Sequence, residues 1–285
     1  MEDEINRMHF KTVDIDGVEL FYREAGDVDK PTMLLLHGFP SASHMFRDLI
    51  PLLMKDYHVI APDFPGFGQT VTPDNFTFTF ENLTKYTENF LKRLKLDSFY
   101  MYVFDYGAPI GFRIASRHPD WIKGIVSQNG NAYQAGLGPK WAERAEFWHN
   151  PTEEKRVQYR NAFSPEVIIN QYLQGSQKEH VSPDGYTLDI AYTSKKAYAD
   201  HQLDLIFDYQ DNVANYPVFQ KYFRQYQPKL LAIWGENDQS FIPAGAEAFL
   251  DDLPNAKVVL IDAGHFALET HAEVVAAQII QMFEY

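Results

Sequence analysis

Three residues far apart in the sequence have the types and the order of a nucleophile, an acid and a base. Asp105 stands in the segment 103–107, V-F-D-Y-G, where a buried strand gives way to a helix. A side chain on such a turn is exposed at the carboxyl end of the strand, and Gly107 allows the close backbone approach that the turn needs. Asp238 and His265 follow two later strands in the same way. The order Asp105, Asp238, His265 predicts a catalytic triad whose nucleophile is a carboxylate.

Each member of this set also has a purely structural interpretation. Asp105 stands where a helix N-cap is favoured, and His265 taken alone is more often a packed or surface histidine. The sequence has no G-x-S-x-G segment that would supply a rival nucleophile. Glu236 is a weaker candidate for the acid than Asp238 by position, and the segment 128–131, Q-N-G-N, offers no carboxylate. Order and spacing together favour catalysis.

The loop after the first central strand supplies further candidates. The segment 37–40 has the sequence H-G-F-P. We expect the backbone amide of Phe39 to join that of Tyr106 in an oxyanion hole. His37 and Pro40 belong to the same loop, so we expect both to border the substrate.

Strand and helix patterns that alternate along the chain predict how these residues meet. Asp16-Gly17 separates two β-rich runs and favours a tight hairpin. After it, short apolar runs alternate with segments of helical period, which predicts a mostly parallel sheet covered by helices on both faces. The expected strands are 32–36, 57–61, 98–104, 123–127, 229–234 and 257–261, and the expected helices are 44–54, 81–96, 107–117, 244–250 and 271–283.

The alternation stops between the fourth and the fifth of those strands. Residues 132–226 have a mostly helical period, are polar, and are rich in Tyr, Gln and Asp. A length of 285 residues fits one large α/β domain with an insertion. We therefore expect a core domain of residues 1–131 and 227–285, and a helical cap domain of residues 132–226.

The motifs together resemble the α/β-hydrolase superfamily. They are H-G-F-P at 37–40, the aspartate turn, G-x-x-D at 235–238 and G-H-F at 264–266. Within the superfamily, nearly the whole chain resembles the branch of epoxide hydrolases and haloalkane dehalogenases that uses an aspartate nucleophile. The resemblance implies an α/β-hydrolase fold, with an eight-strand, mostly parallel sheet and an inserted helical cap over the site. It also implies that the carboxylate attacks a carbon to form an alkyl-enzyme ester, which a histidine-activated water hydrolyses.

The resemblance to epoxide hydrolases implies donors in the cap for the oxygen of the opening ring. Those enzymes carry cap tyrosines, and the segment 207–212, F-D-Y-Q-D-N, resembles the one that holds such a tyrosine. Tyr209 is therefore the candidate proton donor. The second family tyrosine would lie about two helical turns before Pro151, and this chain has Arg144 there. We expect Arg144 and Trp148 to contact substrate, although aromatic residues at such spacing more often pack.

The dehalogenase alternatives match the sequence less well. Haloalkane dehalogenases carry a tryptophan directly after the nucleophile, where this chain has Tyr106. Fluoroacetate dehalogenases carry arginines around the nucleophile and a His-Trp pair in the cap, and neither feature is evident here. We expect epoxide hydrolysis, with haloalkane or haloacid dehalogenation as the alternative. A non-catalytic receptor for a small ligand on the same fold is an alternative of another class.

Composition narrows the partners and the location. A formal net charge of −14 repels phosphate backbones and anionic lipids, so we expect no nucleic acid, no membrane and a small neutral organic substrate. The chain has no cysteine, which excludes disulfides, thiolate nucleophiles and cysteine metal sites. The segment Met1–Glu4 is acidic and no apolar run follows it, so we expect a cytoplasmic protein without a signal peptide. A monomer and a homodimer both fit.

We expect neither a metal nor a cofactor. His201, Asp204 and Asp208 have a helical spacing that a metal site could use. A solvated face of a cap helix explains the same pattern more simply. The segment 66–68, G-F-G, lacks the rest of a dinucleotide-binding motif.

Overall fold

The first two strands form the hairpin that Asp16-Gly17 predicts. A computed structural model describes residues 7–195 and 197–283. In it, β1 (His9–Ile15) pairs antiparallel with β2 (Val18–Ala25). Asp16 and Gly17 both have positive φ, 53° and 85°, which suits the two-residue turn between twisted strands.

The hairpin extends a parallel sheet of eight strands in all, whose order is β1-β2-β4-β3-β5-β6-β7-β8. The pairings from β4 through β3 to β8 are parallel, and β2 joins β4 antiparallel. This arrangement confirms the predicted α/β-hydrolase fold. The parallel strands are β3 (Thr32–Leu36), β4 (His58–Pro62), β5 (Phe99–Phe104), β6 (Ile122–Gln128), β7 (Leu230–Gly235) and β8 (Lys257–Ile261).

Helices cover both faces of the sheet because its central strands are apolar on both sides. Along β3, Met33 and Leu35 enter one hydrophobic cluster while Leu34 and Leu36 enter the other, as the alternation of a strand requires. One cluster includes α2 (Leu49–Leu53) and α12 (Leu268–Phe283), and the other includes α3 (Phe80–Arg93) and α4 (Gly107–Arg117).

Two predicted helices are each divided in the structure. The expected helix 44–54 appears as a 3₁₀ turn, η1 (Ser43–Phe46), followed by α2. Pro51 explains the break, because proline has no N–H to bond the carbonyl of Arg47 in a continuous helix. The expected helix 244–250 appears as α10 (Ala244–Glu247) and α11 (Phe249–Asp252).

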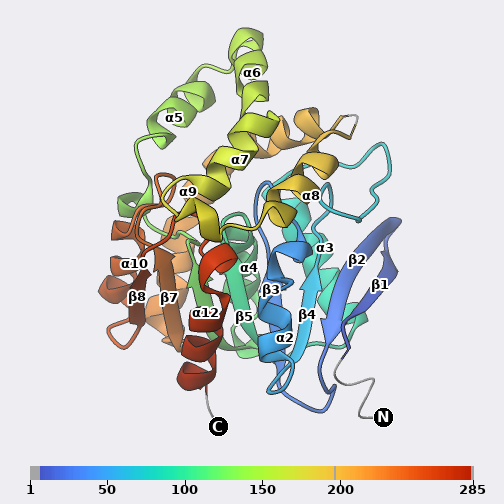
Figure 1. The fold of residues 1–285 in the computed structure, drawn as a ribbon, viewed down its shortest axis with the longest axis vertical. Coiled ribbons are helices and arrows are strands. Elements are labelled where there is room, and N and C mark those ends of the chain that lie inside the picture. The colour runs from blue at the N-terminus through green and yellow to red at the C-terminus, as the bar shows by residue number, and fades with distance from the viewer. Residues whose placement is uncertain (1–6, 196, 284–285) are drawn as a thin grey trace.

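A helical insertion separates β6 from β7. Its helices are α5 (Trp141–His149), α6 (Glu153–Tyr159), α7 (Pro165–Leu173), α8 (Pro183–Thr193) and α9 (Tyr198–Tyr226). The side chains of Thr152, Ser164 and Ser182 cap α6, α7 and α8, which explains where these helices begin. Figure 1 shows α5, α6 and α7 together beyond one end of the sheet, with α8 beside them. No helix among residues 7–195 and 197–283 is long and apolar enough to cross a membrane.

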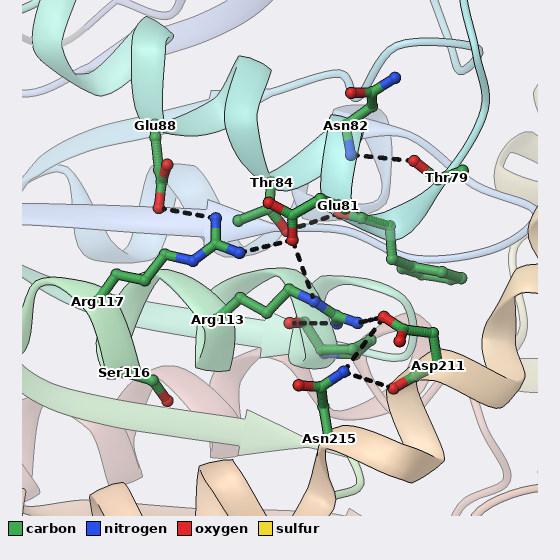
Figure 2. Close-up of polar contacts among 12 residues, drawn as sticks. Thr79, Glu81, Asn82, Thr84, Glu88, Arg113, Ser116, Arg117, Asp211 and Asn215 are labelled. Carbon is green, nitrogen blue, oxygen red and sulfur yellow. Dashed lines mark hydrogen bonds and ion pairs between the residues drawn. The ribbon is translucent and has the colours of Figure 1, made fainter.

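Of two arginines on α4, Arg113 joins the core to the insertion and Arg117 joins α4 to α3 (Figure 2). The Arg113 side chain is 4% exposed and donates to Asp211 Oδ2 and to Asn212 Oδ1, both at 2.6 Å, on α9. One turn later, Arg117 is 37% exposed and donates to Glu81 on α3 at 2.5 Å. The buried arginine therefore holds α4 against α9.

Removing the buried arginine should cost much more stability than removing its exposed neighbour. We expect Arg113→Met to lower the free energy of unfolding by about 1–3 kcal/mol, because the Asn212 oxygen is left buried without its charged donor. Arg117→Met is the matched control, and it should cost less than about 1 kcal/mol, as exposed ion pairs do. Urea denaturation of both variants measures the difference. Equal losses in the two variants would contradict the assignment.

Candidate active site

The turn between β5 and α4 presents the carboxylate of Asp105. Asp105 has φ 46°, in the left-handed region that few side chains adopt, so the chain reverses sharply there. A Cβ atom at Gly107 would overlap the carbonyl oxygen of Leu36, and one at Gly38 would overlap the Asp105 side chain. The turn therefore depends on glycine at both positions.

Backbone amides hold one oxygen of that carboxylate. The amide of Phe39 donates to Asp105 Oδ1 at 2.7 Å, as expected of an oxyanion loop. Burial raises the pKa of Asp105, while the charge of His265 and hydrogen bonds from the amides of Phe39 and Tyr106 lower it in part. The two amides predicted for the oxyanion hole thus both act on Asp105.

His265 lies between the carboxylates of Asp105 and Asp238. Its Nδ1 is 2.7 Å from Asp238 Oδ2, and because a carboxylate only accepts, Nδ1 carries the proton. Its Nε2 is 3.7 Å from Asp105 Oδ2. Burial lowers the pKa of His265, but Asp238 and Asp105 outweigh it, and the pKa is raised overall. The structure therefore brings the three predicted residues together.

Asn129 belongs to this arrangement and sequence reasoning missed it. Its Nδ2 donates to Asp238 Oδ2 at 2.8 Å, and its Oδ1 accepts from the amide of Gly235 at 2.9 Å. Ser240 N donates to the other oxygen of Asp238 at 2.7 Å. The segment 128–131 contains no carboxylate, but an amide at the end of β6 can orient the acid of the next strand. The positive φ of Asn129, 46°, aims its side chain there.

A cavity of about 360 Å³ opens over Asp105 and His265. The core contributes Phe39 and Tyr106 to its wall, and the insertion contributes residues from several helices. Those that carry a polar or charged group include Lys140, Glu143, Arg144, Tyr159 and Gln171. The insertion therefore forms the wall opposite the nucleophile.

Arg144 is the predicted substrate-binding residue of the insertion that lines this cavity. Its guanidinium lies 4.2 Å from the centre of the Trp141 ring, which fixes its position by a cation–π contact. No carboxylate pairs with Arg144 within 4.0 Å among the described residues. Its charge lowers the pKa of Asp105, although burial and closer groups have larger effects. The guanidinium is thus free to meet a ligand.

The structure does not bring His37, Pro40, Trp148 or Tyr209 to the cavity wall. His37 is buried and its Nε2 accepts from the amide of Phe64 at 3.0 Å. Burial lowers the pKa of His37 to about 4, so the ring is neutral and supports the loop.

Pro40 follows Phe39 in the same loop and is buried. Trp148 donates to the carbonyl of Ile206 at 2.9 Å and packs within the insertion. Tyr209 is 1% exposed, and its ring contacts Trp141 and the wall residue Tyr106 at 4.4 and 5.8 Å between centres. The packing of the helices, which the sequence alone does not specify, keeps Trp148 and Tyr209 away from the cavity wall.

The helical set His201, Asp204 and Asp208 engages three separate partners. The His201 ring stacks on Phe78, with centres 4.0 Å apart. Asp204 accepts from Arg156 and Asp208 accepts from the amide of Phe80, at 2.6 and 2.7 Å. Two of these contacts join the insertion to the core, and the third lies within the insertion.

The raised pKa of His265 should depend on the charge of Asp105. We expect Asp105→Asn to lower the pKa of His265, because the neutral amide no longer stabilises the imidazolium while Asp238 still does. Titration of the ring protons by NMR measures this shift. Glu236→Gln, an exposed neighbour of the acid, is the control and should leave the pKa of His265 unchanged. An unaltered value in Asp105→Asn would show that the two charges do not interact.

Comparison with known proteins agrees with this architecture. The protein family described as the alpha/beta hydrolase fold matches residues 31–272 of this chain. An uncharacterized hydrolase of Saccharomyces cerevisiae, YNR064C, is 47% identical over 99% of both chains. Haloalkane dehalogenase 2 of Mycobacterium tuberculosis is 27% identical, over 89% of this chain and 88% of its own.

Solved structures share the fold at low sequence identity. Cfl2 from Burkholderia cenocepacia superposes with a TM-score of 0.82 at 20% identity, covering 97% of this chain and 96% of its own. The haloalkane dehalogenase DbeA from Bradyrhizobium elkanii has a TM-score of 0.79 at 23% identity, covering 97% and 99%. The family match, the relative in yeast and the sheet topology agree, and the chain belongs to the α/β-hydrolase family.

Proposed function

We propose that this protein hydrolyses small epoxides through a covalent ester on Asp105. The observation that carries the mechanism is the unequal environment of the two carboxylate oxygens. Oδ1 accepts the Phe39 amide at 2.7 Å, whereas Oδ2 lies 3.7 Å from His265 Nε2, beyond hydrogen-bond distance. Oδ2 is therefore the attacking oxygen, and Oδ1 becomes the carbonyl oxygen of the ester.

The first step needs no help from the base. A carboxylate is ionised at neutral pH, so Oδ2 can attack a ring carbon directly. The new bond joins Oδ2 to that carbon, the carbon–oxygen bond of the epoxide breaks, and the electron pair stays on the oxygen as an alkoxide. The alkoxide takes a proton from solvent water or from the proposed donor Tyr209, and the product remains attached to Asp105 as an ester.

The second step uses His265 and the oxyanion hole. His265 Nε2 takes a proton from water, whose oxygen attacks Cγ of the ester. Negative charge then develops on Oδ1, to which the Phe39 amide already donates, and the Tyr106 amide is the proposed second donor. When this intermediate collapses, the bond between Cγ and the product oxygen breaks and that oxygen takes the proton held by His265. The new carboxylic acid of Asp105 loses its proton to solvent, so that the diol leaves and the carboxylate is restored. Asp238 keeps the imidazole in the tautomer that leaves Nε2 free to accept.

The groups around Asp105 favour an oxygen leaving group over a halide. A halide is best held by paired N–H donors beside the nucleophile. The side chains that flank the carboxylate, Phe39 and Tyr106, carry no N–H. An alkoxide needs a donor on the opposite wall, where Arg144 lies.

Two residues are proposed as donors to the alkoxide. Arg144 is favoured by its place on the wall, and its charge-assisted N–H groups would stabilise the developing oxyanion. Tyr209 is the proton donor that the resemblance to epoxide hydrolases implies. Burial raises the pKa of Tyr209 well above its usual range, which keeps the phenol protonated. We expect Arg144 to make the larger contribution.

Dehalogenation is the second candidate function. The similarity to haloalkane dehalogenases favours it, and the free guanidinium of Arg144 offers a cation to a halide. The same Asp105 ester would form in either reaction. A receptor without catalysis is less favoured, because Asp105, Asp238 and His265 keep the distances that a triad needs. The cap boundaries 132–226, the neutral substrate and the cytoplasmic location remain our proposals.

The His265→Gln variant should trap the ester. With styrene oxide, alkylation of Asp105 continues while hydrolysis slows by about 100- to 10,000-fold, because the general base is lost. Intact-protein mass spectrometry should then show the enzyme plus one substrate. Asp105→Asn should show no adduct, and His180→Gln, an exposed histidine of the insertion, should turn over normally. An unmodified mass for His265→Gln with every active substrate would indicate direct attack by water.

The donors can be ranked by single-turnover kinetics. We expect Arg144→Gln to slow alkylation by styrene oxide by about 100-fold, as loss of an oxyanion donor does, with less effect on ester hydrolysis. Tyr209→Phe should also slow alkylation, by a smaller factor. Arg160→Gln, an exposed arginine paired with Asp200, is the control. Chloride release from 1-chlorobutane faster than any epoxide turnover would overturn the epoxide assignment while leaving Asp105 in its role.

A further inference from the structure

A second buried carboxylate, Asp189, lies outside the triad. Asp189 is 0% exposed and stands on α8, whose other buried residue is Gly185. A helix that is otherwise at least partly exposed thus buries a charged side chain at its contact with the core. Burial of a carboxylate is unfavourable unless donors surround it, so this position calls for an explanation beyond packing.

A hydrogen-bond donor from the insertion and a histidine from the core meet at Asp189. Tyr172 on α7 donates its hydroxyl to Asp189 Oδ2 at 2.6 Å. His44, on the core loop after β3, places Nε2 at 2.9 Å from Asp189 Oδ1, and Ser41 Oγ lies 3.3 Å from the same nitrogen. The loop from His37 to His44 includes the oxyanion residue Phe39. Asp189 therefore links α7 and α8 to the oxyanion loop.

Tyr172 also packs against the residue that follows His265. Its ring stacks face to face on Phe266, with centres 3.8 Å apart and planes 9° apart. Phe266 directly follows His265, and it packs against Phe104, which directly precedes Asp105. The Phe104 ring also contacts the His265 ring at 4.7 Å. A shift of Tyr172 would consequently move the base relative to the nucleophile.

The close approach of α8 is built into the sequence at Gly185. A Cβ atom at Gly185 would lie 2.9 Å from Glu269 Oε1 and 2.9 Å from the Tyr172 ring. Glu269 itself is held by Arg47 through two hydrogen bonds of 3.0 and 2.6 Å. The backbone of α8 thus sits against groups that are already fixed, and Asp189 is held in one place.

We propose that Asp189 is a positioning residue for the triad. Through Tyr172 and Phe266 it sets the orientation of His265, and through His44 and Ser41 it sets the loop that presents the Phe39 amide. The catalytic part of this proposal rests on the ester mechanism proposed above. The structural part, that Asp189 sets the orientation of His265, does not depend on that mechanism.

The test compares two aspartates on one helix. Asp189→Asn removes the buried charge with little change in shape, and Asp184→Asn makes the same change at an exposed position of α8. Tyr172→Phe is a second variant that removes the hydroxyl but keeps the ring on Phe266. Thermal melting of each variant defines a temperature at which all are folded, and every other measurement is made there.

The first readout needs no substrate. The proton on His265 Nδ1, shared with Asp238, is followed in the low-field region of the NMR spectrum. We expect Asp189→Asn and Tyr172→Phe to shift or broaden this signal, and Asp184→Asn to leave it unchanged. A spectrum of Asp189→Asn and Tyr172→Phe that matches the wild type would overturn the proposal, whatever the enzyme's substrate proves to be.

The second readout separates the two chemical steps with styrene oxide. A misplaced base should slow ester hydrolysis by about 10- to 100-fold and leave alkylation less affected, so that the adduct accumulates. Equal slowing of both steps would mean that Asp189 only stabilises the fold, and would overturn its positioning role. Absence of any adduct or diol with the wild type would instead reject the proposed function, and the NMR readout would still decide on Asp189.

Discussion

The rest of the site depends on a charged carboxylate held on a left-handed turn at the end of a buried strand. Asp105 is 6% exposed and has φ 46°, so both its solvation and its backbone conformation are unfavourable on their own. Two amides, one histidine and the close approach of Gly38 and Gly107 offset these costs. The site is thereby preorganised, because the donors that stabilise the resting carboxylate also point to where the oxyanion of the ester would form.

Each of the other buried acids around the site also needs hydrogen-bond donors that offset its burial. Asp238 receives His265, Asn129 and Ser240, and Asp189 receives Tyr172 and lies against His44. Donors to each acid come from more than one segment of the chain, so satisfying each carboxylate also brings loops together. Loss of a donor would leave a buried carboxylate unpaired and would also release the segment that carries the donor. The same hydrogen bonds therefore pair the acids and position the loops.

The insertion is attached to the core on two sides. Arg113 joins α4 to α9, and Asp189 joins α8 to the loop that carries Phe39. The insertion's share of the cavity wall comes from several helices and includes Arg144 on α5 and Tyr159 on α6.

The sequence alone determined the features that local chemistry encodes. The hairpin at Asp16-Gly17, the alternation of apolar runs and the order Asp105, Asp238, His265 were all visible, because turn propensity, strand period and chain order need no knowledge of distant contacts. Tertiary structure alone decided that Asn129 orients the acid, that Arg144 rather than Trp148 reaches the cavity, and that Tyr209 packs behind Tyr106. Side chains on an amphipathic helix look alike in sequence, and which of them meets a ligand depends on how the helices pack over the sheet.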